Sequence, residues 1–289
     1  MNLSIYTDHL NNAIRFSSFA KMETETMFSG MGIKYVASGE EIYYVNGNKY
    51  AVKQGEYIIG NDFTSAFVKI DHHQAVQGLC IDVSTQIIDE VAGYHHLHGD
   101  DLKSFLLSEQ FLVNKYQAKN TTLGYSLNEI NKSIQNKSFD SLMLNEEVFY
   151  SLAESIIEDQ RYIFNHLNKL NFTKENTNIE VFRLLLQAKN YIHDKLHQHV
   201  SLDELIVEIG MSKYHFIRLF KKVFGLSPYQ YQKVKRVEYA KTLLQKGVNV
   251  AEVAIQLGYT DTASFSKSFK QVSGINPSDI KKQFSTIKI

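Results

Sequence analysis

Between Ile33 and Val83 the hydrophobic residues form short runs separated by turn residues, a pattern typical of a sheet of short strands. The clearest two runs, Ile42 to Val45 and Tyr50 to Val52, flank Asn46-Gly47-Asn48-Lys49. Asn-Gly between two β-rich runs is a strong hairpin signal. Further turn residues divide the region into strands of about five residues, the usual length in a small sandwich or barrel. These turn residues are Gly39, Gly55 and Gly60-Asn61-Asp62.

From Thr85 onward turn residues become rarer and the hydrophobic period lengthens, which predicts helices. The clearest helix begins after Asn145, a suitable N-cap, and carries Glu146 and Glu147 in its first turn. Its apolar stripe suits burial against the β-domain or pairing with the same helix of a second subunit, and the spacing favours neither. The stripe consists of Phe149, Leu152, Ile156, Ile163, Phe164 and Leu167.

The polar segment 171–178 interrupts the helical pattern and predicts a linker. A further helix is predicted after it, leading into a second domain. We therefore expect one domain over residues 1–175 and another over 176–289. The apolar residues that mark the helix after the linker are Ile179, Phe182, Leu185, Leu186, Ile192 and Leu196.

Both prolines of the chain occur in the same local phrase, which reveals an internal repeat. Phe220 to Pro228 reads FKKVFGLSP and Phe269 to Pro277 reads FKQVSGINP, an offset of 49 residues (269 − 220). In each phrase the glycine suits a left-handed helix end, and the proline suits the first position of the next helix. The helix from Pro228 to about Gln245 should span roughly 26 Å.

Each phrase is preceded by a shorter helix and a glycine turn, which completes a helix-turn-helix unit. The first short helix opens with Ser201-Leu202-Asp203-Glu204, the form of a capping box, and its counterpart opens at Val250. The two units are expected over about 201–224 and 250–272. The glycine C-cap and following N-cap in the two turns are Gly210 with Ser212, and Gly258 with Asp261.

The second helix of each unit has an apolar inner face and a polar outward face. Both copies place a cation at the same two outward positions, because Arg218 and Lys221 correspond to Lys267 and Lys270. Such a face suits a helix in the major groove of DNA, where arginine binds guanine in a bidentate manner. An ordinary solvated face with two lysines is the alternative. The inner residues are Phe216, Leu219, Phe220, Val223, Phe265, Phe269 and Val272.

These faces predict two sets of contacts with double-stranded DNA, one to bases and one to phosphates. The expected base-reading residues are Lys213, Tyr214, Ile217 and Arg218 in the first unit, and Thr262, Ala263, Ser264, Ser266 and Lys267 in the second. The expected phosphate contacts are Ser212, Lys221, Lys222, Lys233, Lys235, Arg236, Lys270, Lys281 and Lys282.

The charge distribution agrees with a nucleic-acid partner for the C-terminal domain. The 289 residues carry 31 basic and 31 acidic side chains, yet residues 187–289 hold 16 Lys and Arg against 8 Asp and Glu. A basic module attached to an acidic one suits a polyanionic partner, although surface charge also segregates by chance. Cys80 is the single cysteine, which excludes an intramolecular disulfide and suits a reducing compartment. With no apolar run of about 18 residues and no signal-peptide core, we expect a soluble cytoplasmic protein.

Residues from about 187 to 284 resemble the DNA-binding domain of AraC-type transcription regulators. The resemblance rests on 202–221, on 253–270 and on the phrase Gly274-Ile275-Asn276-Pro277, two motifs in the family's order. It implies binding to an asymmetric site through two successive major grooves, usually by an activator that contacts RNA polymerase. Lys267 stands where the family often has arginine, and Ala263 and Ser264 are small, so the second unit is expected to serve mainly as an anchor.

Residues 33–83 resemble the cupin-like sensory domain that is often fused to this DNA-binding module. The resemblance rests on the turn spacing at Gly39, Gly47 and Gly55-Glu56. It implies an α+β protein, with a cupin-like β-barrel or sandwich and helices followed by an all-α domain of two helix-turn-helix units joined by a central helix. It also implies control by a small effector, and we expect a homodimer. A docking site for a regulatory protein is an equal alternative for the N-terminal domain.

A metal-binding cupin enzyme is the remaining alternative. The candidate ligands are His72-His73 and His95-His96 with His98, but neither group has a carboxylate at the spacing of a metal-binding cupin. The sequence contains no phosphate loop, nucleophile elbow or zincin motif. We therefore expect a protein without cofactor, metal or catalytic residues.

Overall fold

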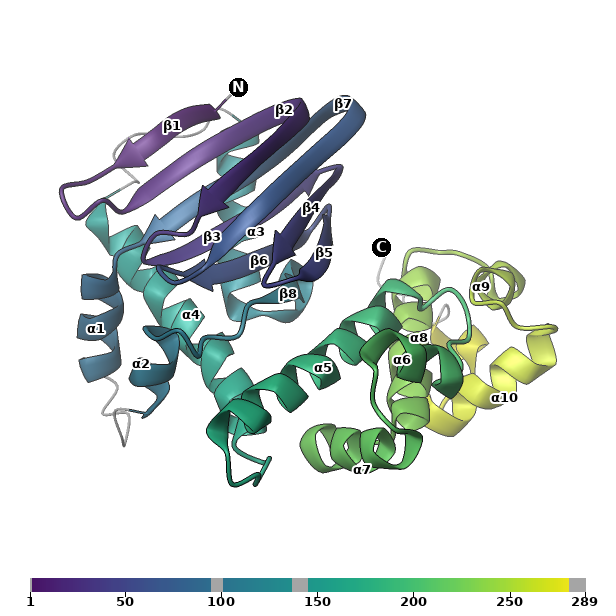
Figure 1. Cartoon of the computed structure of the whole chain (residues 1–289). Helices are drawn as coiled ribbons and strands as arrows, with labels where there is room; N and C mark the ends of the chain where they lie inside the picture. The colour runs from purple at the N-terminus through teal and green to yellow at the C-terminus, as the bar shows by residue number, and fades with distance from the viewer. Residues whose placement is uncertain (1, 95–100, 137–144, 281–289) are drawn as a thin grey trace. The chain divides into compact units, whose positions relative to one another are not determined.

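The computed structural model describes residues 2–94, 101–136 and 145–280, which form two compact units, 1–165 and 166–289 (Figure 1). The sequence placed the boundary between residues 175 and 176, whereas the structure places it between Asn165 and His166. The segment after this boundary packs on the C-terminal unit, where Lys169 Nζ donates a hydrogen bond to the Val223 carbonyl oxygen at 2.9 Å. Each unit is described by itself.

The N-terminal unit contains an eight-stranded antiparallel sheet in the order β1-β2-β7-β3-β6-β8, with β4 paired to both β5 and β7. This arrangement confirms the predicted β-domain followed by helices. The strands are β1 (Asn2–Thr7), β2 (Ala13–Met27), β3 (Met31–Ser38), β4 (Glu40–Val45), β5 (Asn48–Lys53), β6 (Glu56–Asn61), β7 (Ser65–Val83) and β8 (Asn114–Gln117).

Strand β7 connects the parts of the sheet because it pairs with three other strands. Its first half lies against β4, with Val68 opposite Tyr43, and its second half lies against β3, with Leu79 opposite Tyr35. Strand β2 accompanies nearly its whole length on the other side. The predicted strand length of about five residues is therefore wrong for β7, which has 19 residues. The strands β1, β2 and β8 also lie wholly or largely outside the predicted range 33–83.

The β4–β5 hairpin forms where the sequence predicted it, on a tighter turn. Asn46 and Gly47 both have positive φ, 49° and 75°, which is the combination that a two-residue type I′ turn requires. Asn48 and Lys49, expected in the turn, instead begin β5, where they pair with Val45 and Tyr44. The Asn-Gly signal thus fixes the register of this pair of strands.

Among the described residues four α-helices accompany the sheet, and the longest of them contacts β1, α1 and α3 (Figure 1). In that helix, α4, Phe149 is fully buried and its ring lies 5.7 Å from the ring of Tyr6 in β1. Asp159 accepts hydrogen bonds from the first backbone amides of α3, and Tyr150 donates one to Glu90 of α1. The apolar stripe is thus buried mainly within its own chain. The helices are α1 (Thr85–Tyr94), α2 (Asp101–Leu106), α3 (Thr122–Gln135) and α4 (Glu146–Leu167).

The C-terminal unit consists of helices, and it confirms the predicted two helix-turn-helix units joined by a central helix. The predicted linker is shorter than expected, because α5 begins at Glu175 and Asn178 bonds back to the Phe172 backbone. The helices are α5 (Glu175–Asp194), α6 (Leu202–Ile209), α7 (Lys213–Phe224), α8 (Pro228–Gln245), α9 (Val250–Gln256) and α10 (Thr262–Ser273).

The second helices of the two units end in the same way. Gly225 and Gly274 both have φ of 78°, a left-handed conformation that strains residues with a side chain. In the described chain nothing lies within 4 Å of a Cβ added at either position. Replacing these glycines therefore tests the backbone conformation alone.

We expect Gly225→Ala and Gly274→Ala to lower the free energy of unfolding by similar amounts, about 1–2 kcal/mol each. Gly93→Ala is the matched control, because Gly93 lies in α1 without positive φ and with open space around its Cβ. The control should be neutral or slightly stabilising. Urea unfolding followed by far-UV circular dichroism measures all three, and an unchanged stability of both cap variants would contradict the proposed strain.

Candidate nucleic-acid interface

The first helix-turn-helix unit is built from α6 and α7. Ser201 Oγ accepts a hydrogen bond from the Glu204 amide, and the Glu204 carboxylate accepts one from the Ser201 amide, so the predicted capping box is present. The bond from the Ser201 backbone lowers the pKa of Glu204. Gly210 ends α6 in the left-handed conformation with φ of 65°, and α7 begins three residues later at Lys213. The turn thereby sets the angle at which α7 leaves α6.

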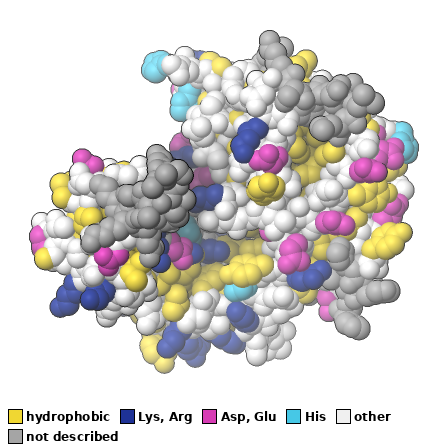
Figure 2. All heavy atoms as spheres, turned by 180° about the vertical axis from the view of Figure 1, so that it is seen from behind, with side chains coloured by type: hydrophobic (Ala, Val, Ile, Leu, Met, Phe, Trp, Pro, Cys, Tyr) yellow, Lys and Arg dark blue, Asp and Glu magenta, His cyan; other side chains and the backbone are white. Residues whose placement is uncertain are grey.

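Helix α7 presents one face to the core and another to solvent. The predicted inner residues are buried, and Phe216 and Phe220 are fully buried. Tyr214 is 79% exposed, an unusual surface position for a large aromatic side chain. Figure 2 shows Lys and Arg side chains along the lower edge of the C-terminal unit. The exposed polar residues of α7 are Lys213, Arg218, Lys221 and Lys222.

The second helix-turn-helix unit has the same arrangement, a short capped helix, a glycine turn and a longer helix, formed by α9 and α10. Asn249, which the sequence analysis did not identify as a cap, accepts a hydrogen bond from the Glu252 amide at 2.8 Å and starts α9. Gly258 then adopts φ of 68°, and α10 begins at Thr262. Helices α7 and α10 each have 12 residues, and their first residues differ by the repeat offset of 49 (262 − 213). The cations at equivalent positions are therefore equivalent in structure, and all four are exposed.

The two units differ at the N-terminus of their second helix. Asp261 accepts hydrogen bonds from the Ser264 amide at 2.7 Å and the Ser264 hydroxyl at 2.8 Å, and the backbone bond lowers the pKa of Asp261. Ser212 occupies the equivalent N-cap position, but its side chain caps no amide in the part of the chain that the structure describes. A carboxylate and a bound hydroxyl thus occupy the start of α10, whereas the start of α7 carries no negative charge. The Ser264 hydroxyl is held by its own helix.

The other expected base-reading residues of α10 are polar or small. Thr262, Ala263 and Lys267 are exposed, and Ser266 is half-buried. In α7, Ile217 departs from the prediction because it is half-buried and lines an apolar cavity with Leu202 and Leu205. Its side chain lies between the outward and inner faces of the helix. The first unit therefore has fewer outward-facing candidate base-reading residues than predicted, because Ile217 is not one of them.

The expected phosphate contacts fall into several groups. Lys221, Lys222 and Lys270 are exposed, whereas Lys233 donates to Gln271 and Lys235 pairs with Glu238. The ammonium of Lys213, expected to read bases, lies 3.3 Å from an Asp203 carboxylate oxygen. These exposed pairs are worth little energy and can exchange for a phosphate. Lys281 and Lys282 lie outside the described residues.

Arg236 departs most from the expected phosphate contact, because it is buried and bonded within the C-terminal unit. It is only 5% exposed, and its guanidinium lies 5.1 Å from the centre of the Tyr259 ring. Its Nη2 donates a hydrogen bond to the carbonyl oxygen of Leu257 at the end of α9. The helix periodicity placed Arg236 on α8 correctly, but it contained no information about which helix α8 packs against.

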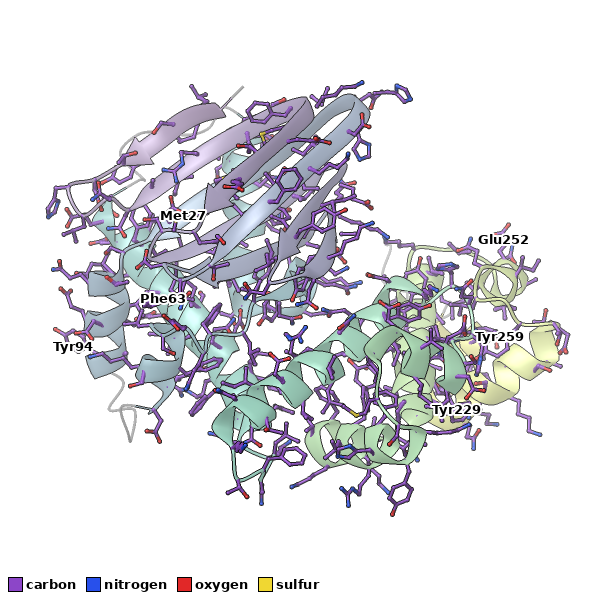
Figure 3. The ribbon with its side chains drawn as sticks, in the orientation of Figure 1. Met27, Phe63, Tyr94, Tyr229, Glu252 and Tyr259 are labelled. Carbon is purple, nitrogen blue, oxygen red and sulfur yellow. The ribbon has the colours of Figure 1, made fainter. Side chains whose placement is uncertain are left out.

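A hollow of about 440 Å³ lies beside α8 and α10, and the sequence analysis missed most of its residues. Lys233, Arg236 and Lys267 contribute cations, and none of the described residues that line it is acidic. Tyr229, which is 63% exposed, and Tyr259 both line the hollow, and Figure 3 labels both side chains. The sequence offered one signal for this hollow, the aromatic residue Tyr229 directly after the proline that starts α8. The remaining lining residues are His199, Gln232, Gly258, Thr260, Ser264, Ser268 and Gln271.

The histidines of the N-terminal unit form no metal centre in the described parts of the chain. No group of three or more His, Cys, Asp or Glu side chains capable of holding a metal is present among residues 2–94, 101–136 and 145–280. His95, His96 and His98 lie outside these residues, and His72 and His73 lie in the exposed middle of β7. Within the same ranges, no helix has the length and apolar character needed to cross a membrane.

Comparison with known proteins identifies the C-terminal unit. Residues 205–283 match a family described as a helix-turn-helix domain. The MmsAB operon regulatory protein of Pseudomonas aeruginosa is 35% identical over 89 residues, which are 30% of this chain and 29% of that protein. The HTH-type transcriptional activator AarP of Providencia stuartii is 33% identical over 89 residues, 30% of this chain and 66% of AarP. The chain thus matches less than a third of the first relative.

Other similarities extend further along the chain. The uncharacterized HTH-type transcriptional regulator YisR of Bacillus subtilis is 24% identical over 276 residues, 91% of this chain and 90% of that protein. Among solved structures, the DNA-binding domain of AdpA in complex with a target DNA aligns with 36% of this chain and 95% of its own, with 24% identity and a TM-score of 0.34. ToxT from Vibrio cholerae aligns with 94% of this chain and 99% of its own, with 13% identity and a TM-score of 0.35.

The position of Arg236 predicts a stability effect. Arg236→Ala removes a buried charged hydrogen bond and its packing on Tyr259, so the free energy of unfolding should fall by about 2–4 kcal/mol. Lys235→Ala, the neighbouring control, removes a partly exposed ion pair and a cation–π contact with Tyr231, and should cost about 1 kcal/mol or less. Urea unfolding of the full chain compares the two variants. Equal and small losses would show that Arg236 has no structural role.

Proposed function

Because residues 205–283 are a helix-turn-helix domain of the AraC type, we propose that this chain is a sequence-specific DNA-binding transcription regulator. The repeat of α7 in α10, with exposed cations at equivalent positions and the 18-residue α8 between them, carries the proposal. A helix of that length spans about 26 Å, which suits two recognition helices about one DNA turn, or about 34 Å, apart. Both helices then enter successive major grooves on one side of the duplex.

Within this arrangement α7 supplies the more specific contacts. Arg218 is suited to bidentate bonds with the O6 and N7 atoms of guanine, and the exposed ring of Tyr214 is suited to apolar contact with a thymine methyl group. Lys267 takes the position of Arg218 in α10, but the small side chain of Ala263 replaces Tyr214. The second unit therefore contributes more to anchoring than to base reading. Lys213 in α7, and Thr262 and Ser266 in α10, complete the proposed base-reading residues at the edges of the outward faces of these helices.

The phosphate contacts come from the ends of the same helices and from the hollow beside α8. Lys221, Lys222 and Lys270 lie in the last turns of α7 and α10, and Ser212 lies before the first turn of α7. Lys233 extends this set along the hollow, where no acidic side chain among the described lining residues opposes a phosphate. These contacts supply salt-dependent affinity and position the reading helices.

The proposal extends to activation of transcription in the cytoplasm. AarP is named as a transcriptional activator, and it matches this chain over the DNA-binding part. By this similarity we propose that the chain activates transcription, and the resemblance to AraC-type regulators implies contact with RNA polymerase. The proposal also includes a homodimer, in which the N-terminal units of two chains pair.

The interior of the N-terminal unit supports control by a small polar effector. Charged side chains are buried within the sheet, among them Lys34 at 7% and Glu41 at 6% exposure. Glu41 accepts a hydrogen bond from the Tyr43 hydroxyl, and burial raises the pKa of both groups. Asp82 pairs with Arg15 through Oδ2, whereas its buried Oδ1 has no hydrogen-bond partner among the described residues. A buried carboxylate oxygen without a partner suits a ligand that carries a hydroxyl or amino donor.

Docking of a regulatory protein on the N-terminal unit is the second candidate. It is favoured by exposed apolar side chains on that unit, of which Met27 is 69%, Phe63 58% and Tyr94 85% exposed (Figure 3). Thermal shift of the full chain with a panel of sugars and amino acids separates the two. A rise in melting temperature supports the pocket, whereas a co-purified protein without any such rise supports docking.

We expect Arg218→Ala to weaken binding by about 1–3 kcal/mol at one preferred base pair and to relax the preference there. Lys221→Ala should instead weaken binding to all sequences and reduce the slope of log affinity against log salt by about one. Fluorescence anisotropy with cognate and random duplexes at several salt concentrations measures both. An equal loss on the two duplexes for Arg218→Ala would exclude base reading by that residue.

Selection of bound sites from random DNA tests the function as a whole. We expect enriched sites with two unequal blocks about one helical turn apart, the α7 block being the more constrained. A matched control is the double variant Arg218→Ala with Lys267→Ala, which should retain salt-dependent binding but lose the preference at the base pairs that these two residues contact. If the unmodified protein enriches no sequence, it is not a sequence-specific regulator.

A further inference from the structure

The first helix-turn-helix unit contains a cavity that DNA recognition does not require. Its volume is about 310 Å³, at the lower end of the range typical of small-molecule pockets. The walls come from α6, α7 and the start of α8, together with the segment before α6. The lining residues are His199, Val200, Leu202, Leu205, Ile217, Ser227, Pro228, Tyr229 and Gln232.

The walls of this cavity are apolar and uncharged. Leu202, Leu205 and Ile217 form much of the lining, and none of the described lining residues is Asp, Glu, Lys or Arg. The exposed rings of His199 and Tyr229 lie 6.2 Å apart at its edge. A flat apolar molecule would gain contact with these rings and with the aliphatic wall. The absence of a lining charge disfavours an ionic ligand.

One side chain that lines the cavity carries a buried polar group without a partner. Gln232 is only 3% exposed, and its Nε2 makes no hydrogen bond with any of the residues 2–94, 101–136 and 145–280. The hydroxyl of Ser227, in contrast, is bound to Gln230 in the capping box of α8. A buried amide donor without an acceptor costs free energy, and a ligand acceptor placed against it recovers that cost. Gln232 therefore specifies a hydrogen-bond acceptor on the ligand.

We propose that this cavity is a binding site for a small neutral aromatic molecule of one or two rings that carries a hydrogen-bond acceptor. The ring occupies the space between Leu205 and Ile217, and the acceptor meets Gln232 Nε2. The site belongs to the DNA-binding unit itself and is distinct from the effector site proposed for the N-terminal unit.

Occupation of the cavity opposes DNA binding, a step that rests on the proposed function. His199, Tyr229 and Gln232 also line the neighbouring hollow, whose other residues include Lys233 and Lys267. The cavity and the hollow thus adjoin at these three residues, and the hollow is lined by Lys267, an outward cation of α10. Ile217, on the wall of the cavity, directly precedes Arg218 in α7. A bound molecule therefore lies under one recognition helix and at the border of the surface that DNA covers.

Quinoline and naphthalene are matched probes, because they have the same two-ring shape and only quinoline has an acceptor. With the full chain we expect quinoline to raise the melting temperature and to bind about fivefold more tightly than naphthalene. Gln232→Leu keeps the side-chain size and removes the donor, so it should bind both probes equally. Leu202→Trp fills the cavity from a half-buried position and should bind neither. Circular dichroism verifies folding, and Val200→Phe replaces Leu202→Trp if that variant is unfolded.

The outcomes separate the inference from the proposed function. If quinoline produces no shift, or binds the unmodified chain no more tightly than naphthalene, the site or the role of Gln232 is excluded. A quinoline preference that persists in Gln232→Leu also excludes that role. Quinoline should weaken binding of a fluorescent duplex in proportion to its occupancy, and an unchanged DNA affinity at saturation excludes competition. A chain that binds quinoline but no DNA would instead overturn the proposed function alone.

Discussion

Burial of two phenylalanines one helical turn apart fixes the orientation of each recognition helix, and the candidate interface depends on it. Phe216 and Phe220 in α7, like Phe265 and Phe269 in α10, are almost completely removed from water. Each such side chain contributes a few kcal/mol, far more than any exposed ion pair. Rotation of either helix would expose these rings, so the side chains opposite to them face outward. The lysine and arginine side chains of α7 and α10 therefore face solvent because the phenylalanines are packed in the core, and not because of interactions that the cations make themselves.

The sequence allowed the C-terminal unit to be predicted in detail because its signals are local. The capping box at Ser201, the glycine at the end of α7 and the proline at the start of α8 each act on the nearest turn of helix, and each lies where expected. Arg236 and Ile217 could not be placed in the same way. Their environments come from helices distant in the sequence, which periodicity within one helix does not describe.

The N-terminal unit was less predictable for a related reason. The hairpin at Asn46-Gly47 is a local feature and was found, but the length of β7 depends on three partner strands. The middle of β7 is polar and exposed, around His72 and His73, so its sequence resembles a turn between two short strands. The buried charges of Lys34 and Glu41 gave no signal either, because a polar residue in a strand usually faces solvent.

The inequality of the two recognition helices has a consequence for the geometry of any complex. A protein with two identical reading faces could bind its site in either of two orientations along the duplex. Here Tyr214 and Arg218 in α7 correspond to Ala263 and Lys267 in α10, on two helices of equal length. Inverting a site would place each block of bases against the wrong helix. The inequality of the two helices therefore favours one orientation of the C-terminal unit along such a site.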